Sequence, residues 1–84
     1  MKHPLDVEKY KGNLEELAKD IGKMRYDKAR DLLGHLGDDI KRQADADAKK
    51  GRKKLAKELY KTADELYEAR DAMGKAWKVC EPYM

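Results

Sequence analysis

Residues 52–80 read RKKLAKELYKTADELYEARDAMGKAWKVC, and this stretch decides the fold. Its mostly apolar positions recur at alternating spacings of four and three residues, which draws one stripe along an α-helix. The stripe consists of Leu59, Ala63, Leu66, Arg70, Met73, Trp77 and Cys80. A second line beside it consists of Ala56, Tyr60, Tyr67 and Gly74. The sequence therefore predicts a helix over residues 52–80 with a wide apolar face, and Pro82 supplies a stop signal just beyond it.

The preceding residues, 25–50, keep the same helical period. Their stripe consists of Tyr26, Ala29, Leu33, Leu36, Ile40, Ala44 and Ala48. Gly34 and Gly37 lie inside this pattern, and each costs about 1 kcal/mol relative to alanine in a helix. Because the stripe keeps its phase through both glycines, we predict one helix over residues 25–50. A break at residues 34–38, where Asp38 or Asp39 could cap a new helix, is the alternative.

Gly51 separates these two predicted helices. A chain that turns back at Gly51 brings together residues whose numbers sum to about 102, because antiparallel helices share the same rise per residue. Ala44 then faces Leu59, and Ile40 faces Ala63. Pairs of this kind are apolar along the whole length, and small residues often oppose large ones, as close packing requires. The two helices are therefore predicted to form an antiparallel hairpin.

A short pattern occurs once in each predicted helix. Ala-Arg-Asp is followed by glycine three positions later, at residues 29–34 and again at residues 69–74. Amphipathic helices of low complexity produce such matches easily. We interpret the similarity as chance rather than duplication.

A shorter helix is predicted before the hairpin, over residues 5–22, with a possible bend at Gly12. Pro4 suits its first turn, and Gly22 suits its end. Asn13 and Glu16 have the spacing of a capping box, so a short first turn followed by a restart is an alternative. With this helix laid along the hairpin, the chain is predicted to be all-α: one domain, residues 1–84, folded as an up-down-up three-helix bundle. The hairpin should project beyond its shorter partner over roughly residues 42–60.

Composition narrows the class of protein. Charged residues make up 44% of the chain, and no stretch is apolar for long enough to cross a membrane. The N-terminal residues lack the apolar centre of a signal peptide. Cys80 is the single cysteine, so no internal disulfide can form, and we expect a cytoplasmic protein with no membrane partner.

Catalytic chemistry has little support in the sequence. His3, His35 and Cys80 are the only soft metal ligands, and they do not have the spacing of a zinc site, which needs three or four ligands. The chain contains no serine and no glycine-rich phosphate loop. We therefore expect no enzyme activity, no bound metal and no cofactor.

One cluster of charge stands out, at the turn between the two long helices. It consists of Lys49, Lys50, Arg52, Lys53 and Lys54 around Gly51, and we call residues 49–54 the basic tip. The whole chain has a net charge of +3, so the chain without this tip is slightly acidic. Cations in the first turn of a helix oppose the helix dipole and cost roughly 0.3–1 kcal/mol each. Together with free N–H groups they form a possible anion site, although a charged turn that only keeps the tip hydrated is the simpler interpretation.

Two functions follow as hypotheses. The first is a non-enzymatic protein-interaction module that self-associates, for example as a homodimer, or binds a partner protein through the projecting tip. Its apolar contacts would be Leu55, Leu59 and Tyr60, because no third helix covers the tip and tyrosine is well suited as an anchor. The alternative is a nucleic-acid-binding accessory protein that uses the basic tip. Such binding should be local, non-specific and sensitive to salt.

Overall fold

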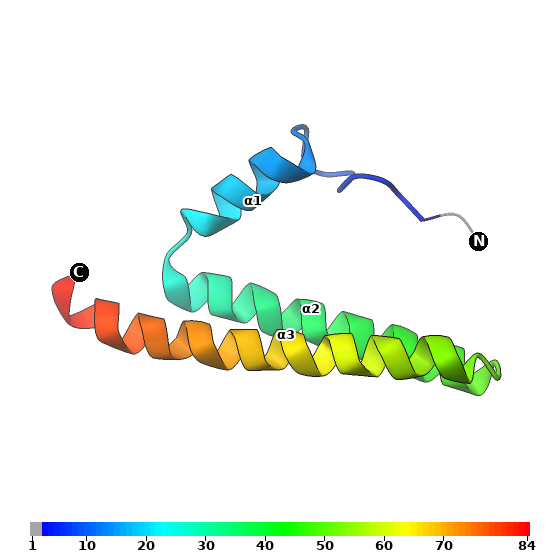
Figure 1. The fold of residues 1–84 in the computed structure, drawn as a ribbon. Coiled ribbons are helices and arrows are strands. Elements are labelled where there is room, and N and C mark those ends of the chain that lie inside the picture. The colour runs from blue at the N-terminus through cyan, green and yellow to red at the C-terminus, as the bar shows by residue number, and fades with distance from the viewer. Residues whose placement is uncertain (1–2) are drawn as a thin grey trace.

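The computed structural model describes residues 3–84 and contains three α-helices in up-down-up order. Helix α1 spans Leu14–Gly22, α2 spans Tyr26–Lys49 and α3 spans Lys53–Cys80, after which a single 3₁₀ turn, η1, spans Glu81–Tyr83. No strand occurs in these residues. The predicted all-α fold with a long antiparallel hairpin is therefore confirmed. Figure 1 shows α2 and α3 lying side by side while α1 rises away from them.

The turn of the hairpin lies at Gly51, as predicted from the sequence. Gly51 has a φ of +80°, the one positive φ among the described residues. Glycine adopts this conformation without the steric cost that a Cβ atom would add. The turn is closed by the Arg52 N–H, which donates to the Asp47 carbonyl at 2.9 Å.

Helix α2 runs without interruption through both of its internal glycines. The alternative break at residues 34–38 is therefore wrong. The glycines are explained by packing, because a Cβ atom at Gly37 would lie 2.8 Å from a ring carbon of Tyr67. At Gly34 the same atom would lie 3.0 Å from Cδ of Arg70. Both positions lack a side chain because a long side chain of α3 lies over the backbone there.

The contact at Gly34 has a counterpart on the other helix. A Cβ atom at Gly74 would lie 3.3 Å from Cδ of Arg30, so each helix lays an arginine stem across a glycine of its partner. The two arginines also pair with the aspartate that follows each of them, at 3.1 Å on α2 and 3.0 Å on α3. The repeated pattern at residues 29–34 and 69–74 thus forms two equivalent contacts related by a local two-fold arrangement.

These contacts join residues whose numbers sum to 104, whereas the predicted level pairs sum to about 102. The difference has a physical cause. Each side chain of an α-helix leans toward the N-terminus of its own helix. In an antiparallel pair, a long side chain on either helix therefore reaches a residue beyond its own level, and the sum rises.

The seam between α2 and α3 is built from small residues. The buried apolar side chains are alanines, at 6%, 0%, 3% and 1% exposure for Ala29, Ala44, Ala56 and Ala63. Gly37 is buried among them. No large side chain among the described residues is fully buried. Small residues let the two backbones approach closely, and the larger side chains are consequently displaced to the two sides of the seam.

Helix α1 is shorter than predicted. The expected helix over residues 5–22 is wrong in its first half, because α1 begins at Leu14. The capping box is the reason: the Glu16 N–H donates to the Asn13 side-chain oxygen at 2.8 Å, and the Asn13 N–H donates to the Glu16 carboxylate at 3.2 Å. Asn13 in extended conformation starts the helix there, as the alternative of a restart after Gly12 anticipated.

The backbone of α1 stays apart from α2 and α3, and none of its residues is buried. The chain is consequently long and flat, with backbone dimensions of 49 × 29 × 14 Å. Its radius of gyration is 15.2 Å, whereas a compact chain of this length has about 12 Å.

Candidate functional site: the flanks and tip of the hairpin

The α2–α3 hairpin has two long sides of different chemistry. Successive residues of a helix point about 100° apart, so the neighbours of buried Gly37 lie on opposite sides of the seam. Asp38 lies on one side and Leu36 on the other. On α3, the residues at positions 60 and 67 lie on the side of Asp38, while those at positions 59 and 66 lie on the side of Leu36. We call these sides the tyrosine flank and the leucine flank.

Hydrogen bonds between the helices close the tyrosine flank. The Tyr67 hydroxyl donates to the Asp38 carboxylate at 2.5 Å, and the Tyr60 hydroxyl donates to the Asp45 carboxylate. The guanidinium of Arg70 lies over the Tyr67 ring, 4.8 Å from its centroid. Both tyrosine hydroxyls of this flank therefore find a carboxylate partner on α2.

These hydrogen bonds also change the acidity of both phenols. The bond to Asp45 raises the pKa of Tyr60, and partial removal from water raises it further. The bond to Asp38 is likewise the main cause of the raised pKa of Tyr67, with desolvation second. In both cases the protonated phenol is favoured because only that form can donate to a carboxylate.

Apart from Gln43 and Asp47, which line a cavity with Leu55 at the tip, the leucine flank carries aliphatic and thioether side chains, none of them fully buried. These side chains are Leu33, Leu36, Ile40, Leu55, Leu59, Leu66 and Met73. Leu36 and Leu55 are 45% and 46% exposed, and the other five are half-buried. On α3 its members follow at seven-residue spacing from Leu59 through Leu66 to Met73, and Leu59 and Leu66 directly precede Tyr60 and Tyr67. Apolar residues at this spacing are typical of a helix that packs against another helix.

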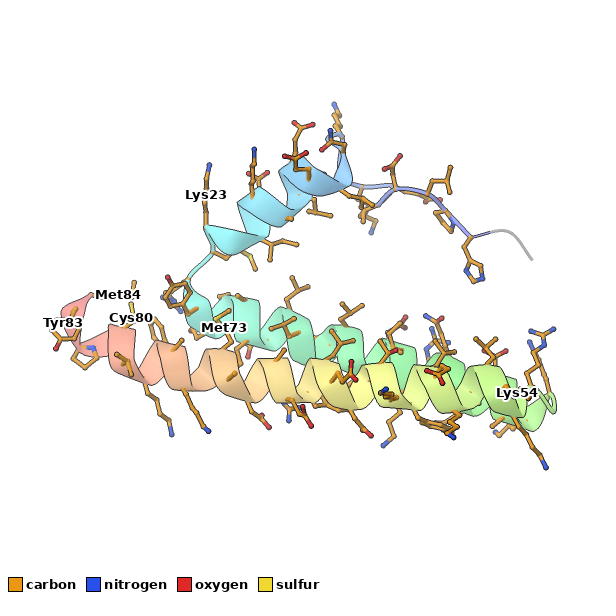
Figure 2. The ribbon with its side chains drawn as sticks, viewed as in Figure 1. Lys23, Lys54, Met73, Cys80, Tyr83 and Met84 are labelled. Atoms are coloured by element: carbon orange, nitrogen blue, oxygen red, sulfur yellow. The ribbon has the colours of Figure 1, made fainter. Side chains whose placement is uncertain are left out.

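Among the described residues, the segment before α2 lines a cavity with the hairpin at each of the hairpin's two ends. At the open end, a cavity of about 370 Å³ lies between the α1–α2 turn and the end of α3, where Met24 faces Cys80 and Met84. Figure 2 shows Cys80 and Met84 on the side of α3 nearest that turn, while Lys23 points away from the hairpin. At the tip, His3 borders a second cavity of about 500 Å³ beside Gln43 and Leu55.

The open end of the hairpin is held by Arg25. Its guanidinium pairs with Asp27 at 2.7 Å and lies 5.5 Å from the centroid of the Trp77 ring. The same hydrogen bond lowers the pKa of the Asp27 carboxyl below its ordinary value. Arg25 therefore connects the start of α2 to the end of α3, just after the turn from α1.

The basic tip lies at the far end of the hairpin from this pair. Arg52 is partly neutralised, since its guanidinium pairs with Asp47 at 3.2 Å. The four lysines of the tip are exposed, and none of them belongs to an ion pair among residues 3–84; they are Lys49, Lys50, Lys53 and Lys54. Lys54 marks the position of the tip in Figure 2. Helix α3 begins here without a side-chain cap.

The structure separates the three apolar residues predicted to form one contact. Leu55 and Leu59 lie on the leucine flank, but Tyr60 lies on the tyrosine flank with its hydroxyl bound to Asp45. The sequence interpretation missed Leu36 as a surface residue, because the stripe through it was assigned to the core. The seven-residue spacing on α3 was the available signal, since it places two lines of different chemistry beside one seam.

The side chains of His, Cys, Asp and Glu do not gather in threes as a metal site would need anywhere in residues 3–84. Within the same residues, none of the helices has the length and apolar character required to span a bilayer.

The chain was compared with known proteins at three levels. No family model matches it, and neither the curated proteins nor the solved structures provided a match.

Proposed function

We propose that the protein is a non-enzymatic protein-interaction module whose contact surface is the leucine flank, including Leu55 and Leu59 next to the tip. One observation carries this proposal: the large aliphatic side chains of the hairpin lie half-buried or exposed, while the buried apolar side chains are alanines. A continuous exposed apolar surface is typical of a binding site. A common partner for such a surface is an amphipathic helix, which packs its own apolar face against it.

The difference between the flanks supports the choice of surface. On the tyrosine flank the hydroxyls and carboxylates satisfy one another, so a partner would gain little there. On the leucine flank each aliphatic side chain covered by a partner contributes about 25 cal/mol per Å² removed from water. A cytoplasmic location, expected from the single cysteine, is part of the same proposal.

The test uses a photoreactive residue, p-benzoyl-phenylalanine, placed at position 36 or at position 79. Val79 is 72% exposed and lies on the side of α3 away from the seam, so it is a matched apolar control. We expect irradiation in an extract of cells that make the protein to give a defined protein adduct from position 36 and none from position 79. Equal labelling from both positions, or none from either, would contradict the proposal.

The exposed lysines of the basic tip favour a second candidate, contact with the phosphates of a nucleic acid. Because cations that neutralise phosphates release counterions, such binding weakens steeply with salt. Fluorescence anisotropy with short labelled DNA and RNA measures it. A variant with Lys50→Glu, Arg52→Glu and Lys53→Glu should bind more weakly and with a smaller salt slope. If the unmodified protein does not bind at about 50 mM salt, this candidate is excluded.

A further inference from the structure

The chain exposes more surface than a folded monomer of its size. Its accessible surface is 7107 Å², whereas a compact monomer of 9.7 kDa exposes about 5,100 Å². The excess is therefore about 2,000 Å² per chain. Two chains together therefore have an excess of about 4,000 Å², which lies within the range of about 2,000–5,000 Å² that obligate homodimers bury in total.

Helix α1 also has an apolar side that the rest of the chain covers only in part. It has nine residues, and isolated helices shorter than about 12–15 residues are marginal in water. Its apolar side chains are only partly covered, with Leu14 57% exposed and both Leu17 and Ile21 half-buried. A capping box starts this helix, but a cap contributes only about 1 kcal/mol. Something must pack against its apolar side.

We propose that a second copy of this chain occupies the leucine flank, and that the two α2–α3 hairpins pack flank to flank as an antiparallel two-fold dimer. The four long helices then form a common core, and each α1 closes one side of it. This inference rests on the proposed function, because it names the partner that the interaction surface takes. In an interface of this symmetry the same patch is used by both copies.

Charge distribution favours a second copy over a partner of different composition. The seven aliphatic and thioether side chains of the leucine flank are all uncharged. Charged groups at its edge pair with one another, Asp39 with Arg42 and Asp47 with Arg52. A surface without charges is matched by another surface without charges, because any buried ion would lack a partner. Its own duplicate is such a surface. The strongly apolar character is also typical of obligate homodimers.

The charge of the basic tip favours antiparallel over parallel packing of the two hairpins. It carries five cations, while the chain as a whole carries a net charge of +3. A parallel arrangement would place the two tips together, and like charges within a Debye length of about 8–10 Å repel one another. An antiparallel arrangement instead places each tip beside the remainder of its partner, which is slightly acidic.

The first experiment measures the mass in solution by sedimentation equilibrium over a range of concentrations. We expect twice the chain mass of 9.7 kDa. In a variant with Leu36→Glu and Leu66→Glu, two uncompensated carboxylates per chain should raise the dissociation constant by at least about 100-fold. Val79→Glu, an equal change on the far side of α3, should leave it unchanged.

The second experiment measures orientation in the unmodified sequence. A nitroxide attached to Cys80, the single cysteine, gives one inter-label distance in the dimer. Because 28 helical residues span about 42 Å, antiparallel hairpins place the two labels roughly 40 Å apart, and parallel hairpins place them within about 20 Å.

Several results would overturn the inference. A monomeric unmodified protein at every concentration removes the dimer, even if the double variant fails to fold. A dimer that Val79→Glu disrupts and Leu36→Glu with Leu66→Glu does not has another interface, and a short label distance contradicts the antiparallel arrangement. A monomer that still gives the position 36 adduct with a different protein overturns only the dimer, whereas a monomer without any adduct also overturns the proposed function.

Discussion

The two flanks of the hairpin are built from adjacent residues of the same helices, yet only one of them is completed by the chain. On α3, Leu59 precedes Tyr60 and Leu66 precedes Tyr67, so both flanks repeat at the same levels. Tyrosine has the reach to cross the seam and finds a carboxylate on α2. Leucine has no polar group to direct it across the seam, so it stays at the edge of the seam, partly exposed. A seam of alanine and glycine thus joins two helices but leaves the larger aliphatic side chains only partly covered.

The largest expected effect comes from filling the seam itself. Ala44 is fully buried, so Ala44→Leu inserts atoms into the seam between α2 and α3. We expect a loss of about 1–3 kcal/mol in the free energy of unfolding, because overpacking forces shifts in the neighbouring helix. Urea denaturation at one fixed protein concentration measures it. Ala69→Leu, on the exposed surface of α3, is the control, and a similar loss there would mean that the seam is not the tight region.

A smaller loss is expected at the glycine that supports the tyrosine flank. In Gly37→Ala the new methyl would lie 2.8 Å from the Tyr67 ring, which is itself tied to Asp38. The ring must move, and the cost should exceed the gain of about 1 kcal/mol in helix propensity, leaving a net loss on the order of 1 kcal/mol. The same denaturation measurement applies. A variant more stable than the unmodified protein would show that the Tyr67 ring moves aside at little cost.

The opposite sign is expected at a glycine outside both flanks. Nothing lies within 4 Å of a Cβ atom built at Gly22, the last residue of α1, and its φ is not positive. Gly22→Ala should therefore raise the free energy of unfolding by up to about 1 kcal/mol through helix propensity alone. Comparing this variant with Gly37→Ala separates backbone propensity from side-chain packing. A loss at both positions would contradict that separation.

The weakest effect concerns pH and the two tyrosine hydrogen bonds. Folding raises the pKa of Tyr60 and Tyr67, so their contribution to stability is complete below the unfolded phenol pKa of about 10 and is lost as the pH rises through the folded values. We expect thermal unfolding to occur at lower temperature as the pH rises above about 10. The double variant Tyr60→Phe with Tyr67→Phe should show a smaller decrease. An equal decrease in both proteins would assign the alkaline effect to other groups.

The sequence predicted the local elements well because their signals are local. Helical period, the unbroken phase through Gly34 and Gly37, and the turn at Gly51 all depend on residues close together in the chain. The start of α1 was missed although its capping box was recognised, because the apolar spacing before Gly12 favoured a longer helix. The function inferred from the tip and its neighbours stays a proposal.

Only the tertiary structure decided which apolar line faces what. Periodicity establishes that Leu59, Tyr60 and Ala63 share one broad face, but not that Ala63 closes the seam while the other two diverge to opposite flanks. That outcome depends on the distance between the helix axes and on the reach of each side chain across it. The sequence by itself thus determined the helices and their order. Their packing left one flank closed by the tyrosines and the other open, because a two-helix seam as narrow as an alanine contact has no room for leucine.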